Sequence, residues 1–139
     1  MSYIKQLQNG LVTLLQDKDV YLIGEDITEP YGGSFKVSKG LSLEFPNQVI
    51  ATPMSEQGFT GMGIGMALAG LKVIVEIMFG DFITLCADQM INHASKFVGL
   101  YDKKFTLSYA LLWVDTEVME ELILNLWKSF LWVIQIFGL

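Results

Sequence analysis

Short apolar runs alternate with helix-forming stretches along the first hundred residues, and this alternation constrains the fold more than any other feature. The apolar runs are typical of buried strands and lie at residues 20–23, 49–50 and 73–78. Apolar residues at helical spacing and a stretch rich in small residues predict helices at residues 4–15, with Ser2 as a cap, 56–69 and 81–97. The alternation predicts an α/β fold, a mainly parallel sheet flanked by helices.

The expected helix at 56–69 carries an unusual number of glycines. Each interior glycine costs a helix about 1 kcal/mol relative to alanine. Four of them in one helix therefore indicate close packing of its backbone against another helix or a cofactor: Gly58, Gly61, Gly63 and Gly65. Gly70 is suited to end this helix.

Composition excludes several classes of protein. The chain is 52% hydrophobic and has a net charge of −6, which argues against disorder and against a nucleic-acid partner. One cysteine, Cys86, and one histidine cannot form an ordinary zinc site, so no metal ligands are expected. A single cysteine suits a reducing compartment, and the polar N-terminus lacks the apolar region of a signal peptide, so we expect a cytoplasmic protein.

A lone carboxylate in apolar, glycine-rich sequence is the first candidate functional group. Glu56 lies in the run 52–61, where a predicted strand passes into a predicted helix. It can serve a chemical role, or it can be an ordinary carboxylate favoured by the helix dipole. Glu25 and Asp26 follow the strand at 20–23, at the end that faces the ligand crevice in open α/β sheets, although a plain turn would also explain them.

Six motifs in register give the chain a specific resemblance. Over residues 1–107 it resembles the N-terminal, pyrimidine-binding (transketolase-like) domain of the β subunit of the E1 component of thiamine-diphosphate-dependent 2-oxo acid dehydrogenases. Pyruvate, branched-chain and acetoin types share this domain. The motifs occupy residues 24–26, 31–33, 36–41, 52–61, 76–82 and 88–94.

The resemblance implies roles for four residues. It implies that Glu56 is catalytic and binds the N1′ atom of the cofactor's aminopyrimidine, which favours the imino form that activates the cofactor. Met78 and Phe82 match positions that line the aminopyrimidine pocket, and Glu25 matches an acidic position near the cofactor. Without the resemblance, Met78 and Phe82 could equally be core residues.

The resemblance also implies partners. The family holds the diphosphate and Mg²⁺ of thiamine diphosphate with a motif on a separate α subunit, and no such motif occurs here. The implied partners are an α subunit, a second β subunit and the lipoyl-bearing acyltransferase complex. The implied function is the β-subunit part of oxidative decarboxylation of a 2-oxo acid, with acyl transfer to a lipoyl group. We expect this form to be inactive or incomplete; the alternative is a non-catalytic fragment that serves only as a subunit-interaction module.

Residues 108–139 depart from the family, and we expect a truncated domain followed by an atypical hydrophobic, helical tail. Our hypothesis is a shift of reading frame near codon 107; the alternative is a genuine variant tail. Reading from the third base forces glycine, glycine, glutamate and glycine where the family has them, at Trp113–Val114, Met119–Glu120, Trp127–Lys128 and Trp132–Val133. Residues 122–139 carry one charge, but their length and polar interruptions argue against a membrane span.

Overall fold

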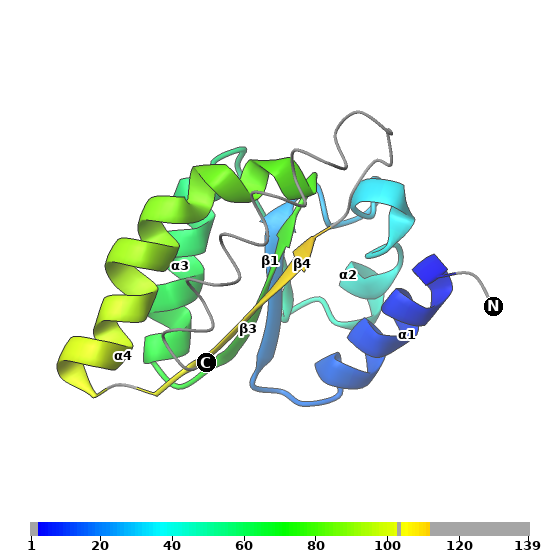
Figure 1. Cartoon of the computed structure of the whole chain (residues 1–139). Coiled ribbons are helices and arrows are strands. Elements are labelled where there is room, and N and C mark those ends of the chain that lie inside the picture. The colour runs from blue at the N-terminus through cyan, green and yellow to red at the C-terminus, as the bar shows by residue number, and fades with distance from the viewer. Residues whose placement is uncertain (1–2, 103, 112–139) are drawn as a thin grey trace.

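A four-stranded parallel sheet forms the centre of the molecule (Figure 1). A computed structural model of the chain describes residues 3–102 and 104–111. The strand order is β2-β1-β3-β4. The strands are β1 (Val20–Glu25), β2 (Val49–Thr52), β3 (Lys72–Ile77) and β4 (Thr106–Leu111). The predicted α/β class, with a parallel sheet flanked by helices, is confirmed.

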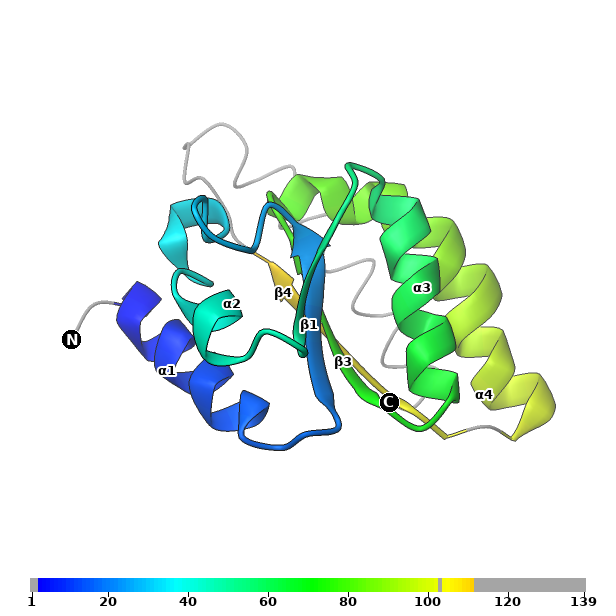
Figure 2. The ribbon, with the colours of Figure 1, turned by 180° about the vertical axis from the view of Figure 1, so that it is seen from behind.

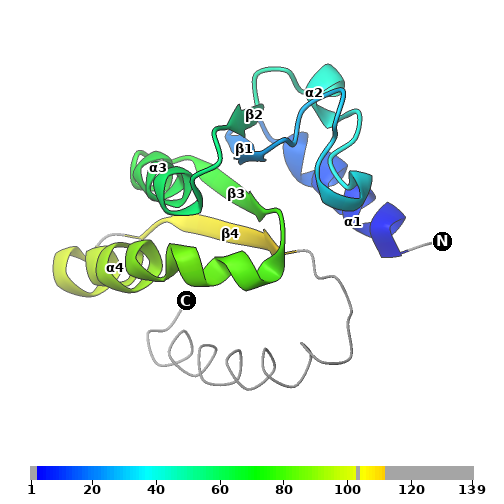
Figure 3. The ribbon, with the colours of Figure 1, turned by 90° about the horizontal axis from the view of Figure 1, so that it is seen from above.

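Helices cover both faces of the sheet, as the view from above shows (Figure 3). Helices α1 (Tyr3–Leu15) and α2 (Leu41–Glu44) lie on one face, and α3 (Glu56–Leu68) and α4 (Ser95–Tyr101) lie on the other. A short 3₁₀-helix, η1 (Ser34–Lys36), lies in the loop between β1 and α2. This arrangement buries both faces, as a parallel sheet requires.

Two hydrophobic clusters follow from the alternation of side chains along the strands. Leu22 and Ile74 point toward α1 and α2, where they pack with residues such as Leu15. Ile23 and Val75 point the other way and pack with residues of α3, including Phe59. The near-continuous apolar runs in the sequence are explained because these strands are buried on both sides.

The close packing of α3 expected against another helix is found at Gly61, where a Cβ would stand 3.1 Å from Oε1 of Gln89 in a later helix, whereas Gly63 packs closely against the sheet. A Cβ at Gly63 would stand 3.1 Å from Val75 Cγ2 and 3.2 Å from Ile23 Cδ1. A Cβ at Gly65 would meet no atom within 4 Å, so this glycine faces open space. Gly70, with a φ of +98°, follows the helix in the left-handed conformation predicted for it.

The prediction of one continuous helix at 81–97 is wrong. The chain instead makes the 3₁₀-helix η2 (Gly80–Cys86), the π-helix η3 (Gln89–Ala94) and then α4. Ile83 and Cys86 are both buried against the same cluster. A spacing of three residues puts them on one side of a 3₁₀-helix, because that helix has three residues per turn.

Strand β4 was not expected from the sequence. It pairs with β3 from Lys72↔Thr106 to Ile77↔Leu111, so one strand runs across residue 107. The division of the chain at that residue therefore stays a prediction. Ser2 and most of the expected tail, residues 112–139, lie outside the described residues. Within the part of the chain that the structure describes, every helix is too short or too polar to cross a bilayer.

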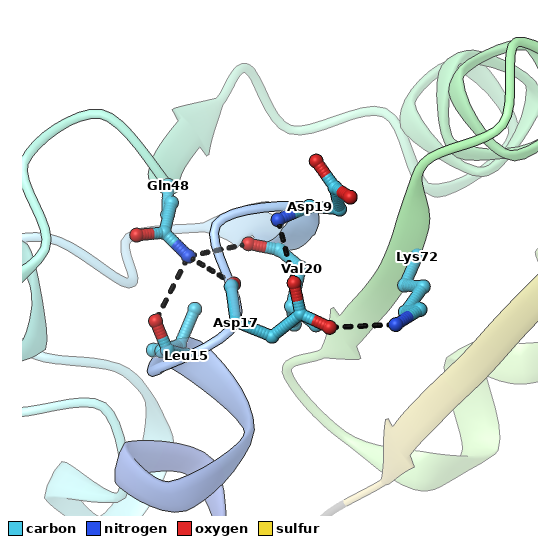
Figure 4. A network of polar contacts seen from close by, with 6 residues as sticks. All are labelled: Leu15, Asp17, Asp19, Val20, Gln48 and Lys72. Atoms are coloured by element: carbon cyan, nitrogen blue, oxygen red, sulfur yellow. Dashed lines mark hydrogen bonds and ion pairs between the residues drawn. The ribbon is translucent and has the colours of Figure 1, made fainter.

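Figure 2 shows α1 and β1 from behind, and one amide side chain joins the end of α1 to the sheet (Figure 4). Gln48, just before β2, places Nε2 3.0 Å from Leu15 O, 2.9 Å from Asp17 O and 2.8 Å from Val20 O. Lys72 and Asp17 form an exposed ion pair of 2.6 Å beside it. The amide thus gives a partner to the Leu15 carbonyl at the end of α1 and links that end to the turn and to the start of β1.

Candidate functional site

The four residues predicted for the site lie at the carboxyl ends of three neighbouring strands, the upper edge in Figure 1. Glu25 is the last residue of β1, and Glu56 opens α3 shortly after β2. Met78 directly follows β3, and Phe82 lies in η2. Because parallel strands end at one edge, these four positions share that edge of the sheet, while the roles predicted for them stay predictions.

Glu25 and Glu56 form an electrostatically coupled pair of carboxylates. Both side chains are half-buried. Burial raises the pKa of Glu25 above its ordinary value, and the neighbouring charges of Asp26 and then Glu56 raise it further. The edge of the sheet therefore carries two acids close enough to influence each other, a common arrangement in sites that handle protons.

Glu56 opens α3, so the helix dipole also favours its charge, as the alternative interpretation held. Of its apolar neighbours in the sequence, Phe59 is buried in the core but Met54 is 77% exposed. Met54 lies in the segment between β2 and α3, and its exposed side chain leaves Glu56 only half-buried.

Cys86 lies beneath this helix start. Its Sγ is 3.6 Å from Glu56 O and accepts a hydrogen bond from Thr60 Oγ1 at 3.2 Å. The thiol is fully buried, and burial raises its pKa, so it remains a protonated donor. The backbone of Glu56 is thus tied to η2, the element that carries Phe82.

Met78 and Phe82 offer apolar surface at the same edge. Neither belongs to the two core clusters, so packing of the core does not account for them. Phe82 is 37% exposed and meets Phe79 edge to face at 5.9 Å between ring centroids. Met78 is half-buried, and its carbonyl accepts a hydrogen bond from Ser34 Oγ at 2.7 Å.

A further acid, Glu76, was missed as a candidate. It lies in β3 and is only 2% exposed, and neither carboxyl oxygen has a hydrogen bond of good geometry. Burial raises its pKa to about 7. The sequence contains a signal for this residue: a glutamate in the middle of an apolar strand is costly to bury unless it has a partner or a function. Among the described residues, no group of three or more acidic, histidine or cysteine side chains could hold a metal ion.

The comparison with protein families decides what this arrangement belongs to. The family model described as "Transketolase, pyrimidine binding domain" matches residues 1–99. The chain belongs to this family. The pyrimidine-binding domain thus accounts for β1, β2, β3 and the helices between them.

Curated relatives of the domain are named as β subunits. The chain is 48% identical over 82 residues to the mitochondrial "Pyruvate dehydrogenase E1 component subunit beta" of Saccharomyces cerevisiae. This match covers 58% of the chain and 22% of the yeast protein. The chain is 39% identical over 105 residues to the "Acetoin:2,6-dichlorophenolindophenol oxidoreductase subunit beta" of Bacillus subtilis, covering 67% and 31%. The mitochondrial pea (Pisum sativum) pyruvate dehydrogenase β subunit is 44% identical over 86 residues, covering 61% and 24%. The matched part is thus under a third of each of these relatives.

Proposed function

We propose that this chain provides the β-subunit part of a thiamine-diphosphate-dependent 2-oxo acid dehydrogenase. The reaction is oxidative decarboxylation of a 2-oxo acid, with transfer of the acyl group to a lipoyl group. One observation carries the proposal: the charge of Glu56 acts on Glu25 at the edge of the sheet that also presents Met78 and Phe82. The names of the relatives support it, since they include pyruvate dehydrogenase β subunits.

The side chains at this edge fit the aminopyrimidine half of thiamine diphosphate. A planar, polar heterocycle needs a carboxyl group at one ring nitrogen and apolar surface against its faces. Glu56 supplies the carboxyl group, and the partly exposed Phe82 ring and the Met78 thioether supply the apolar surface. When bound, the cofactor supplies the carbon that adds to the substrate carbonyl and accepts its electrons as CO₂ leaves.

In this proposal Glu56 is the catalytic residue and Glu25 assists it. Glu56 holds a proton between its carboxyl group and the ring nitrogen. A carboxyl group keeps that proton near neutral pH only when water is excluded. Met54 leaves the edge open in this chain, so we propose that an α subunit covers it and holds the diphosphate and Mg²⁺. A second β subunit and a lipoyl-bearing acyltransferase complete the proposed assembly.

The test is reconstitution. The full chain is mixed with the α subunit of a pyruvate or acetoin enzyme, thiamine diphosphate and Mg²⁺, and decarboxylation of 2-oxo acids is measured. Glu56→Gln should reduce turnover at least about a hundredfold, in the range that general acid–base groups contribute. Glu44→Gln, an exposed carboxylate of α2, serves as the matched control and should leave turnover unchanged.

The same mixture tests the alternative of a non-catalytic subunit-interaction module. Sedimentation velocity measures association of the chain with the α subunit independently of turnover. Tight association without decarboxylation would favour the interaction module, and turnover that survives Glu56→Gln would overturn the proposed role of Glu56. A cytoplasmic location stays a proposal, because relatives of both bacterial and mitochondrial origin match the chain.

The division of the chain also stays a proposal: residues 1–107 as the domain, and 108–139 as a segment read in a shifted frame. Strand β4 continues regularly through residues 108–111, so its pairing with β3 is compatible both with a shifted reading frame and with a genuine variant. The gene sequence tests it. If reading from the third base beyond codon 107 fails to restore the family pattern, the segment is a genuine variant.

A further inference from the structure

Glu76 lies deep in the sheet without a charged partner. It is in register with Gly24 of β1 and Ala110 of β4, and it shares a face with Ile74. No cation among the described residues pairs with it. A buried acid in this setting costs free energy, so its retention in a central strand calls for a purpose beyond packing.

The loop between β1 and α2 lies directly over this carboxyl group. A Cβ at Gly33 would stand 2.6 Å from Glu76 Oε1, and it would also collide with Ser38 Oγ. Ser38 is fully buried, and its hydroxyl and the Ser34 amide lie close enough to the Glu76 carboxyl group to lower its pKa. Neither Ser38 Oγ nor either Glu76 oxygen has a hydrogen bond of good geometry, so these polar atoms face each other across the contact between the loop and β3 with their hydrogen-bonding capacity largely unused.

The same loop is attached to the backbone beside the candidate site at two points. Gly33 N donates to Asp26 O at 2.9 Å, directly after Glu25. Ser34 Oγ donates to Met78 O at 2.7 Å. A shift of residues 33–38 relative to β3 would therefore displace the backbone at Asp26, next to Glu25, and at Met78.

We propose that Glu76 is a positioning residue whose carboxyl group fastens residues 33–38 to β3 and thereby holds Glu25 and Met78 at the candidate cofactor site. The attachment of residues 33–38 to β3 is a property of this chain alone, whereas its effect on cofactor binding rests on the proposed function. Glu76 touches neither substrate nor cofactor in this proposal and acts through the loop.

The fastening depends on the protonation state of Glu76. Burial raises its pKa to about 7, and the Ser34 amide and the Ser38 hydroxyl, which face it from the loop, partly offset that rise. The neighbouring strands present only Gly24 and Ala110 in register with it. A protonated carboxyl group can donate to Ser38 Oγ. Ionisation leaves a buried charge without a cation, and because this desolvation outweighs the two loop donors, opening the loop to water becomes more favourable.

Amide hydrogen exchange of the full chain tests the proposal. Protection of the amides of residues 33–41 is measured at about pH 6 and about pH 8 and corrected for the intrinsic effect of pH. In the wild-type chain and in the Glu44→Gln control, protection should fall about tenfold between these values, the effect of one unit in pKa. Glu76→Gln should abolish the change, because its amide is neutral at both. A pH effect that survives in Glu76→Gln would overturn the proposal, as would its absence in the wild-type chain.

A second variant separates positioning from simple packing. In the Glu76→Ala variant, the loop amides should be less protected from exchange than in the wild-type chain at both pH values. In the Glu76→Gln variant, they should stay protected at both. If Glu76→Ala does not fold, the comparison of Glu76→Gln with the wild-type chain is sufficient. In the reconstituted enzyme, Glu76→Ala should raise the KM for thiamine diphosphate more than Glu44→Gln does. If exchange behaves as expected but no reconstitution occurs, the proposed function fails and the fastening stands. If reconstitution succeeds but exchange does not respond, the fastening fails.

Discussion

Gly33 lies against the Glu76 carboxyl group so closely that a methyl group at Gly33 would stand 2.6 Å from Glu76 Oε1. The φ of Gly33 is +72°, a conformation that residues with a Cβ rarely adopt. Close approach and backbone conformation both require glycine here. This contact joins the loop to the strand that leads into Met78.

The contact predicts that Gly33→Ala destabilises the fold. We expect a loss of about 1–3 kcal/mol in the free energy of unfolding, from backbone strain and overpacking together. Chemical denaturation monitored by circular dichroism measures it. Gly65→Ala is the matched control, because that glycine has open space around it and lies within α3. It should stabilise by up to about 1 kcal/mol. Equal effects of the two substitutions would contradict the close contact at Gly33.

The raised pKa of Glu76 predicts a pH dependence of stability. The folded protein holds this proton up to about pH 7, whereas the unfolded chain releases it near the ordinary value of 4.5. Stability from this group is therefore fully present below about pH 4.5 and is lost as the pH rises to about 7. The loss is on the order of 3 kcal/mol, the free-energy equivalent of the shift.

Glu76→Gln isolates this contribution. Relative to the wild-type chain, the variant should gain stability as the pH rises from about 5 to about 8, and the difference should level off above that. Thermal unfolding of both proteins across this range measures the gain, and other titrating groups cancel in the comparison. Parallel curves for the two proteins would show that Glu76 titrates as an ordinary exposed acid.

The Gln48 amide predicts a large effect from a single polar side chain. Gln48→Ala removes contacts to the carbonyls of Leu15, Asp17 and Val20, so we expect a loss of about 1–3 kcal/mol in the free energy of unfolding. The control is Gln57→Ala, which removes an exposed amide whose one contact, to Asp88, is 3.4 Å long. That change should be within about 0.5 kcal/mol. Denaturant titration of both variants decides, and a Gln48→Ala effect no larger than the control's contradicts the bridging role.

The coupling of the two site acids predicts a shift that can be observed without any cofactor. The charge of Glu56 is one of the causes that raise the pKa of Glu25. Glu56→Gln removes that charge and should lower the pKa of Glu25, although burial, the larger cause, keeps it above the ordinary value. A carboxyl-carbon NMR titration measures this. Glu44→Gln should leave the Glu25 titration unchanged; an identical curve in the Glu56→Gln variant would place the two acids too far apart to interact.

Local pattern predicted most of the elements. The strands at β1, β2 and β3 and the helices α1 and α3 arise from apolar periodicities that are complete within each segment. The same reasoning failed for residues 80–101, where an expected single helix is divided among three helical forms. It failed there because the burial of Ile83 and Cys86 against α3 depends on the partner surface, and local pattern does not contain that surface. Strand β4 was missed because its parallel partner, β3, lies far away in sequence.

The candidate site divides in the same way. The sequence by itself determined that acids and apolar residues stand at the ends of predicted strands, and its motifs indicated the family. Only the tertiary structure decided that Met54 leaves Glu56 partly open and that Glu76 is a buried acid beneath Gly33 and Ser38. The reason is physical: the order of residues along a strand sets which face each side chain takes, whereas desolvation of a carboxyl group depends on what packs over that face.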